Sequence, residues 1–162
     1  MKGPVLNTDP PAYCLFLSTE TTDIESALIR RLSMCDWSHA GFYRNADSWT
    51  FSAMNDGKGV AWRPPNPRCS MLLLDMPRVD EVAEIAFTQE GKPYNRKEIL
   101  GFLCNRDWTH PGEFDCDQLV FWSAAQLGTP LLNPTFIPIE HLTPRDILLS
   151  PLVTQIARRV TS

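Results

Sequence analysis

Cys116 has the sequence surroundings of a cysteine nucleophile. It begins an apolar helical pattern that Gly128 can end. In the first turn of a helix, unpaired backbone N–H groups and the helix dipole stabilise a thiolate. Asp115 and Asp117 flank the thiol and are expected to raise its pKa by like-charge repulsion, so a positively charged imidazole is needed to offset them. The alternative is a buried core cysteine, because most free cysteines pack as small hydrophobes.

His39 is the histidine whose position suits that partner role. It begins an alternating segment in which His39, Gly41 and Tyr43 share one face. A histidine on a rigid strand beside a glycine can present its ring to a facing helix, and a thiolate–imidazolium pair then lowers the thiol pKa. The alternative is a half-buried histidine bonded to a backbone carbonyl. The other histidines, His110 and His141, lie in proline-containing segments typical of solvated histidines.

Hydrophobic periodicity predicts the elements that carry these side chains. Short apolar or alternating runs indicate strands, and the turn compositions between three of them indicate an antiparallel meander. We expect strands at Cys14–Leu17, His39–Tyr43, Trp49–Ala53, Val60–Trp62 and Met71–Leu74. We expect helices from a capping box at Thr22–Glu25 to about Leu32, from Asp80 to a cap at Gly91, from Cys116 to Gly128, and near Leu152–Val160.

The chain has the size and composition of one domain. Its 162 residues are 43% hydrophobic, which is enough for one core. We expect a single domain over 1–162, with a flexible arm at 1–12 and a wrapping segment at 130–162. The formal net charge of -4 argues against a nucleic acid or an anionic membrane as partner, since both demand a basic patch.

Prolines interrupt Met1–Tyr13, where a signal peptide needs an apolar run, and no segment of the sequence is long and apolar enough to span a bilayer. We therefore expect a soluble protein without a signal peptide, cytoplasmic by default, or else phage-associated or exported by a dedicated system.

The five cysteines form neither an even set nor a C-x-x-C pair. This pattern predicts reduced thiols, with no disulfide framework, no structural zinc and no cofactor. A metal site built from Cys104, His110 and Cys116 is an alternative, although their spacing fits no common zinc pattern.

Two sequence blocks resemble the signature of the NlpC-type papain-like cysteine peptidases. Gly91–Tyr94 followed by Phe114–Val120 resembles their G-x-x-Y loop and the helix that starts F-D-C-S-x-L-V, and Ser38–Tyr43 resembles their S-H-V-G-I-Y strand. The histidine block precedes the cysteine block here, which is similar to the circularly permuted, YiiX-like branch. Leu28–Arg30 is similar to a helix of that branch, and the resemblance spans about Cys14 to Pro151.

The resemblance implies a fold class and a set of roles. The implied fold is α+β and papain-like, circularly permuted, with an antiparallel sheet or partial barrel packed against the nucleophile helix. Cys116 is implied as nucleophile, His39 as general base, Ser52 as the third, ring-orienting residue and Tyr94 at the oxyanion side. Ser52 departs from the larger His, Asn, Gln or Glu that the family commonly uses, and Asp117–Gln118 departs from its usual small or Ser-Glu pair after the cysteine.

The implied reaction is cleavage of an amide bond by Cys–His acyl transfer, with a peptide, a peptidoglycan fragment or another amide as substrate. The acidic neighbours Asp115 and Asp117 disfavour a strongly anionic leaving group unless Arg63, Arg96 or Arg106 screens them. A lipid or thioester acyl hydrolase or acyltransferase is one alternative. A non-catalytic binding or assembly module is another, and the sequence does not fix the oligomeric state.

Overall fold

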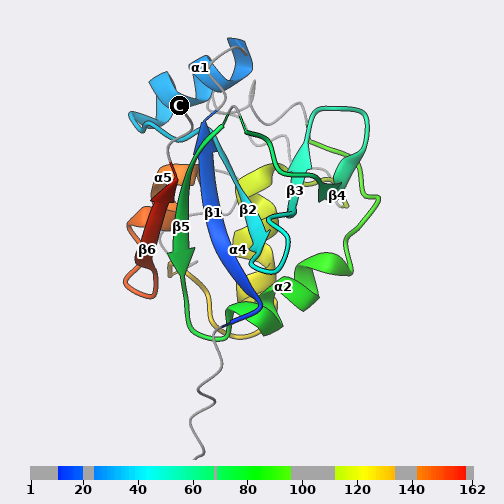
Figure 1. Ribbon diagram of the computed structural model, residues 1–162, viewed down its shortest axis with the longest axis vertical. Coiled ribbons are helices and arrows are strands. Elements are labelled where there is room, and N and C mark those ends of the chain that lie inside the picture. The colour runs from blue at the N-terminus through cyan, green and yellow to red at the C-terminus, as the bar shows by residue number, and fades with distance from the viewer. Residues whose placement is uncertain (1–10, 20–23, 68, 96–111, 134–141, 160–162) are drawn as a thin grey trace, which may run out of the picture.

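The computed structural model describes residues 11–19, 24–67, 69–95, 112–133 and 142–159 (Figure 1). Several residues of the sequence analysis lie outside these ranges. They are most of the N-terminal arm, the start of the first capping box, the segment 99–102, part of the wrapping segment, Arg96, Cys104, Arg106, His110 and His141.

Strands in the described part of the chain form one antiparallel sheet in the order β4-β3-β2-β1-β5-β6. Their bounds are β1 Tyr13–Thr19, β2 His39–Arg44, β3 Thr50–Met54, β4 Gly59–Arg63, β5 Ser70–Asp75 and β6 Thr154–Arg159. The predicted meander is confirmed, since β2, β3 and β4 pair in sequence order. β1 inserts between β2 and β5 and joins the meander to the rest of the sheet.

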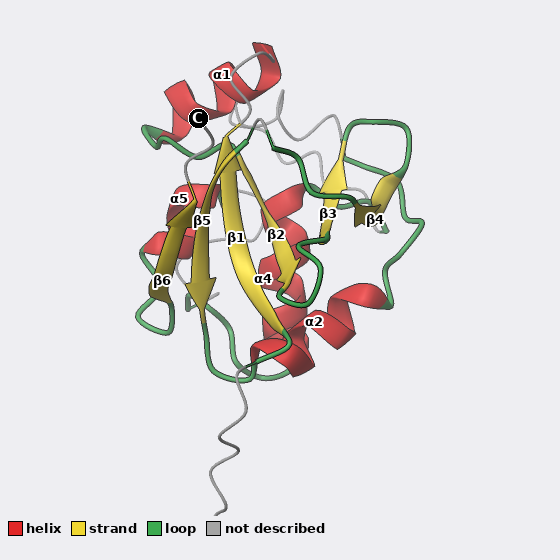
Figure 2. Cartoon of the chain, in the orientation of Figure 1, coloured by secondary structure: helices red, strands yellow, loops and turns green. Residues whose placement is uncertain are grey.

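The expected papain-like NlpC-type fold, permuted or otherwise, is wrong as a fold class. The described strands make an open six-stranded sheet that ends at β4 on one side and β6 on the other, with no partial barrel among them. On the other side of β1 the sheet continues through β5, and the far edge of β5 pairs with β6. Figure 2 shows the strands side by side, with helices behind them and one helix beyond their upper ends.

The predicted final helix near Leu152–Val160 is also wrong, because this segment contains β6. Short runs with few apolar residues fit helical and extended periods equally well, so periodicity alone cannot distinguish them. The backbone groups along the outer edge of β5 need hydrogen-bond partners, and β6 supplies them in an antiparallel register that pairs Leu73 with Ala157.

The helices lie on one face of the sheet, except the first, which lies beyond the ends of the strands (Figure 1). Their bounds are α1 Ile24–Ser33, α2 Val79–Phe87, α4 Cys116–Gln126 and α5 Pro144–Leu148. α4 packs on β2 and β3, and α2 packs on β1 and α4. Side chains from both layers form the main core, among them Leu17, Phe42, Phe51, Val82 and Leu119, which are fully buried.

Strand alternation divides the side chains between two faces. Phe42 and Ala40 of β2 point toward α4 and belong to the main core. Tyr43 points the other way, into a smaller cluster with Cys14, Phe16 and Leu73. His39 and Gly41 alternate with Tyr43, so they lie on this second face, away from α4.

Gly41 is the point of closest packing on the second face. A Cβ atom at this position would lie 2.5 Å from the Phe51 carbonyl oxygen, 2.7 Å from Ser52 Cβ and 2.8 Å from the Phe16 ring. We therefore expect Gly41→Ala to destabilise the protein by about 1–3 kcal/mol, the usual cost of overpacking a filled interior. Urea unfolding at equilibrium measures this change, and an unaltered midpoint would show that the neighbourhood of His39 has unused space.

The described helices are all too short or too polar to cross a lipid bilayer.

Candidate active site

α4 begins at Cys116, as predicted, because Asp115 caps it. The Asp115 carboxylate accepts a hydrogen bond from the Gln118 backbone N–H at 2.8 Å, and the Gln118 side chain accepts one from the Asp115 N–H at 3.3 Å. This reciprocal capping box satisfies two of the donors that a helix start leaves open. It fixes the thiol of Cys116 in the first turn.

The Cys116 thiol is buried, with 3% of the residue exposed. Its Sγ donates to Asp117 Oδ1 at 2.8 Å, and the Ala40 backbone N–H donates to the sulfur. Burial raises the pKa of the thiol, and the negative charges of Asp117 and Asp115 raise it further. The effect expected of the flanking aspartates is thus confirmed, and the expected low thiol pKa is wrong for this state.

His39 is the first residue of β2, and its ring is held on two sides. Nε2 lies 2.9 Å from Ser52 Oγ, and the ring centroid lies 5.7 Å from that of Phe16. Burial and, to a smaller extent, the charge of Arg63 together lower the pKa of His39 to about 3, and Asp56 opposes this shift. The imidazole is therefore neutral near pH 7, so the imidazolium expected to offset the aspartates is absent from this state.

Ser52 makes the contact that the family resemblance implied for it. It lies on β3, buried, and its hydroxyl faces the His39 ring. Its role in orienting the ring during a reaction stays a prediction.

Tyr94 reaches the start of α4 through its backbone. It forms an isolated parallel bridge with Phe114, two residues before Cys116. The flanking hydrogen bonds, from the Phe114 N–H to the Pro93 carbonyl and from the Asn95 N–H to the Phe114 carbonyl, fix this bridge at 3.2 and 3.0 Å. The structure thus brings Tyr94 near the helix terminus that carries the thiol.

Arg63 is also part of this site, although its sequence position indicated only a role in charge screening. It ends β4, is 9% exposed, and forms an ion pair with Asp56 in the β3–β4 turn. The sequence signal that could have found it is an acidic residue in a hairpin turn followed by a basic residue at the end of the next strand.

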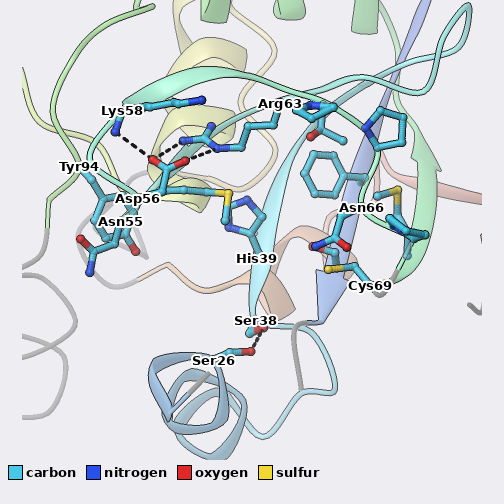
Figure 3. A pocket seen from close by; sticks show the side chains of 18 of the residues that line it. Ser26, Ser38, His39, Asn55, Asp56, Lys58, Arg63, Asn66, Cys69 and Tyr94 are labelled. Atoms are coloured by element: carbon cyan, nitrogen blue, oxygen red, sulfur yellow. Dashed lines mark hydrogen bonds and ion pairs between the residues drawn. The ribbon is translucent and has the colours of Figure 1, made fainter. Parts of the chain in front are cut away.

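A cavity of about 700 Å³ lies on the second face of the sheet, beside the His39 ring (Figure 3). Its wall combines polar side chains with apolar ones, prolines among them. The described lining includes Ser18, Ser26, Ser38, His39, Asn55, Asp56, Lys58, Arg63, Asn66, Cys69 and Tyr94. Cys116 is not among the described lining residues, so the described wall of the cavity contains the imidazole of His39 but not the thiol.

The thiol and the imidazole approach the same end of β2 from the two sides of the sheet. Cys116 contacts the backbone of Ala40 from the α4 side, and His39 is the preceding residue with its ring on the other face. Among the described residues, the thiol is hydrogen-bonded to Asp117 and Ala40 and the imidazole to Ser52, without a direct bond between the two.

Metal-binding side chains do not gather anywhere in the described residues, since no group of three or more His, Cys, Asp or Glu could hold an ion. Cys104 and His110, which the metal alternative requires, lie outside the described ranges. The described cysteines, Cys14, Cys35, Cys69 and Cys116, form no disulfide.

The fold is similar to that of a solved bacterial protein. The crystal structure of the metalloprotein yiiX from Escherichia coli O157:H7, DUF1105, matches with a TM-score of 0.65 and 16% sequence identity, over 93% of this chain and 98% of that one. No protein-family model and no curated protein sequence matches the chain. The likeness supports the YiiX-like part of the resemblance found in the sequence, and at this identity it concerns the fold alone.

Proposed function

We propose that this chain is a thiol hydrolase that cleaves an amide bond with Cys116 as nucleophile and His39 as general base. The observation that carries the proposal is that the two residues approach the same end of β2 from the two sides of the sheet. The Cys116 thiol contacts Ala40, the neighbour of His39, from a capped helix terminus, and the His39 ring is held by Ser52. These are the parts that nucleophilic acyl transfer needs.

The hydrogen bond to Ser52 assigns roles to the two ring nitrogens. Because Nε2 faces the Ser52 hydroxyl, we assign proton transfer to Nδ1. The Cys116 sulfur gives its proton to Nδ1 and bonds to the carbonyl carbon of the substrate. Nδ1 then returns the proton to the leaving amine as the C–N bond breaks, and a thioester remains. Water attacks the thioester, again through Nδ1, and releases a carboxylic acid and the free thiol.

The oxyanion formed in this reaction lies at the start of α4. The backbone N–H of Cys116 is in the first turn, where no carbonyl of the helix can accept from it, and Tyr94 is held near this terminus by its bridge to Phe114. Both are suited to stabilise developing negative charge on the carbonyl oxygen. The reaction also requires the thiol to leave Asp117 and turn toward His39.

Amides in peptides or in peptidoglycan stems are the substrate class that we propose. The cavity beside His39 can accept an extended polar chain, because serine, asparagine and proline residues make up much of its described wall.

A metal has no part in this proposal. The description of yiiX as a metalloprotein has no counterpart in the described donor groups, and stoichiometric zinc in the purified protein would reopen the question.

A non-catalytic binding module is the second candidate. The buried thiol, its bond to Asp117 and its separation from the described cavity wall favour this function.

Incubation of the purified protein with muropeptides, followed by mass spectrometry, distinguishes the hydrolase from the binding module. We expect new amine and carboxylate termini. Release of fatty acid from lipid vesicles without cleavage of muropeptides would favour an acyl hydrolase, and binding without cleavage of either would favour the module.

Ser52→Ala is expected to reduce kcat/KM for amide hydrolysis about two- to tenfold. One neutral hydrogen bond, worth roughly 0.5–1.5 kcal/mol, is at stake. Ser18→Ala is the matched control, because Ser18 pairs with His39 in the β1–β2 register and also lines the cavity. Equal losses in the two variants would remove the special role of Ser52, and a loss as large as that of His39→Ala would show a stronger one.

A further inference from the structure

The Arg63 guanidinium joins the hairpin that carries Ser52. Its Nη1 donates to the backbone carbonyls of Ser52 at 2.6 Å and Ala61 at 2.8 Å. Its Nη2 donates to the Gly59 carbonyl at 2.8 Å and to Asp56 at 2.9 Å, and its Nε donates to the other Asp56 oxygen at 2.9 Å. A guanidinium has five N–H donors, so each has a partner within the hairpin and none is left to bind a substrate.

Asp56 keeps the buried positive charge of Arg63 compensated. Burial raises the pKa of Asp56, but the hydrogen bonds from Arg63 and from the Lys58 backbone outweigh this effect, and the pKa is below its ordinary value. The carboxylate is therefore ionised, and the two side chains form a bidentate pair, the geometry in which arginine fixes a carboxylate best. Figure 3 shows this pair beside His39 in the cavity.

We propose that Arg63, together with Asp56, is a positioning residue for the imidazole of His39. Arg63 holds the backbone of Ser52, and the Ser52 hydroxyl holds Nε2 of His39 at 2.9 Å. Arg63 also places a positive charge beside the ring, which opposes protonation of the imidazole. Arg63 thus prepares the neutral ring that a general base requires. The part of this inference that concerns hydrolysis rests on the proposed function.

Other ionisable groups also face the imidazole. Asp56 and Lys58 of the β3–β4 turn, Cys69 before β5 and Tyr94 line the same cavity. Cys116 approaches from α4 through Ala40, with Asp115 and Asp117 beside it. Among the described groups, the charge of Arg63 is the largest electrostatic influence on the ring after burial, and Asp56 acts against it.

Titration of the histidine ring protons by NMR, in the full-length protein, tests the inference without requiring any hydrolysis. His39→Gln identifies the His39 signal. In the unaltered protein we expect the His39 signal to stay constant between about pH 5 and 8. Arg63→Met should move its midpoint upward, toward the ordinary histidine range, whereas Arg63→Lys, which keeps the charge but loses the planar fork, should leave the midpoint low.

The kinetics of amide hydrolysis test whether Arg63 also positions the His39 ring. We expect Arg63→Lys to lower kcat/KM for amide hydrolysis about two- to tenfold, the loss expected when Ser52 no longer holds the ring. Arg44→Met is the matched control, because Arg44 forms a similar bidentate pair with Asp47 in the neighbouring turn and does not line the cavity. It should leave the His39 midpoint and the kinetics unchanged.

Arg63→Met leaves Asp56 unpaired, and an unpaired partly buried charge can unfold a protein. If this variant does not fold, the double variant Asp56→Asn/Arg63→Met replaces the ion pair by neutral groups, and the same upward shift is expected because the stronger, pKa-lowering charge is removed. An unmoved His39 midpoint in the folded variant would overturn the inference. Absence of hydrolysis by the unaltered protein, with the shift present, would overturn only the proposed function.

Discussion

Replacement of either Cys116 or His39 by alanine is expected to lower kcat/KM for amide hydrolysis about a thousandfold or more. In the proposed reaction the sulfur forms the covalent bond to the substrate and the imidazole transfers the proton in both steps, so the two would act as a unit and neither would retain most of the activity alone. The double variant should therefore be about as slow as the single variants. Kinetics on a muropeptide or peptide-amide substrate measure all three.

Cys35→Ala is a suitable control for the cysteine replacement. Cys35 is a partly buried thiol outside the proposed site, and its removal should leave kcat/KM unchanged. Mild and equal losses for Cys116→Ala, His39→Ala and Cys35→Ala would mean that the three variants only loosen the fold, and the proposed site would then be abandoned.

Asp117→Asn is expected to make Cys116 more reactive. The Asp117 carboxylate accepts from the thiol at 2.8 Å, and its negative charge raises the pKa of the thiol. An asparagine keeps the size of the side chain and removes that charge. Below the thiol pKa, each unit by which the pKa falls gives about ten times more thiolate, the species that reacts with iodoacetamide.

The rate of alkylation of each cysteine, followed by mass spectrometry across a range of pH, measures this effect. Cys35 and Cys69 provide internal references within the same sample, and Asp75→Asn is a control carboxylate on β5. Faster reaction at Cys116 alone supports the explanation. Acceleration at all cysteines would indicate a loosened fold, and an unchanged Cys116 rate would show that burial, not Asp117, keeps the thiol inactive.

Asp117→Asn should also change the dependence of stability on pH. Burial and Asp115 raise the pKa of Asp117, so the folded state disfavours the ionised carboxylate. The resulting destabilisation is present above the ordinary pKa of an aspartate and disappears as the pH falls below it. The variant should therefore be more stable than the unaltered protein near pH 7, and the two should converge under acid conditions.

Local sequence patterns were sufficient to predict much of the fold. The meander from β2 to β4 and the helix that starts at Cys116 depend on neighbouring residues, such as the turn at Asp56 and the capping box of Asp115 and Gln118, and these signals are visible in the sequence. β6 is different, because only the presence of an unpaired β5 edge decides whether its residues form a strand.

The residues of the candidate site were named from the sequence and its family resemblance, whereas their protonation and hydrogen bonding were not predicted. The sequence indicated Cys116, His39, Ser52 and Tyr94, and the contact between Ser52 and His39 is present. It did not indicate that the ring is neutral or that the thiol is bound to Asp117, because both depend on burial and on charges that the folded chain brings together. The expected low thiol pKa, which assumed both a helix terminus and an imidazolium partner, was therefore wrong in direction.

The sheet order has a consequence for how the molecule folds. His39, Ser52 and Arg63 belong to consecutive strands of one meander, so their contacts close short loops, whereas Cys116 reaches Ala40 from far along the chain and β6 pairs with the distant β5. Loop closure costs more entropy as the separation grows, and contacts of long range form late. We expect the imidazole to be oriented before the thiol arrives, so a newly synthesised chain passes through a stage in which Cys116 is exposed to oxidants while the rest of the site is already in place.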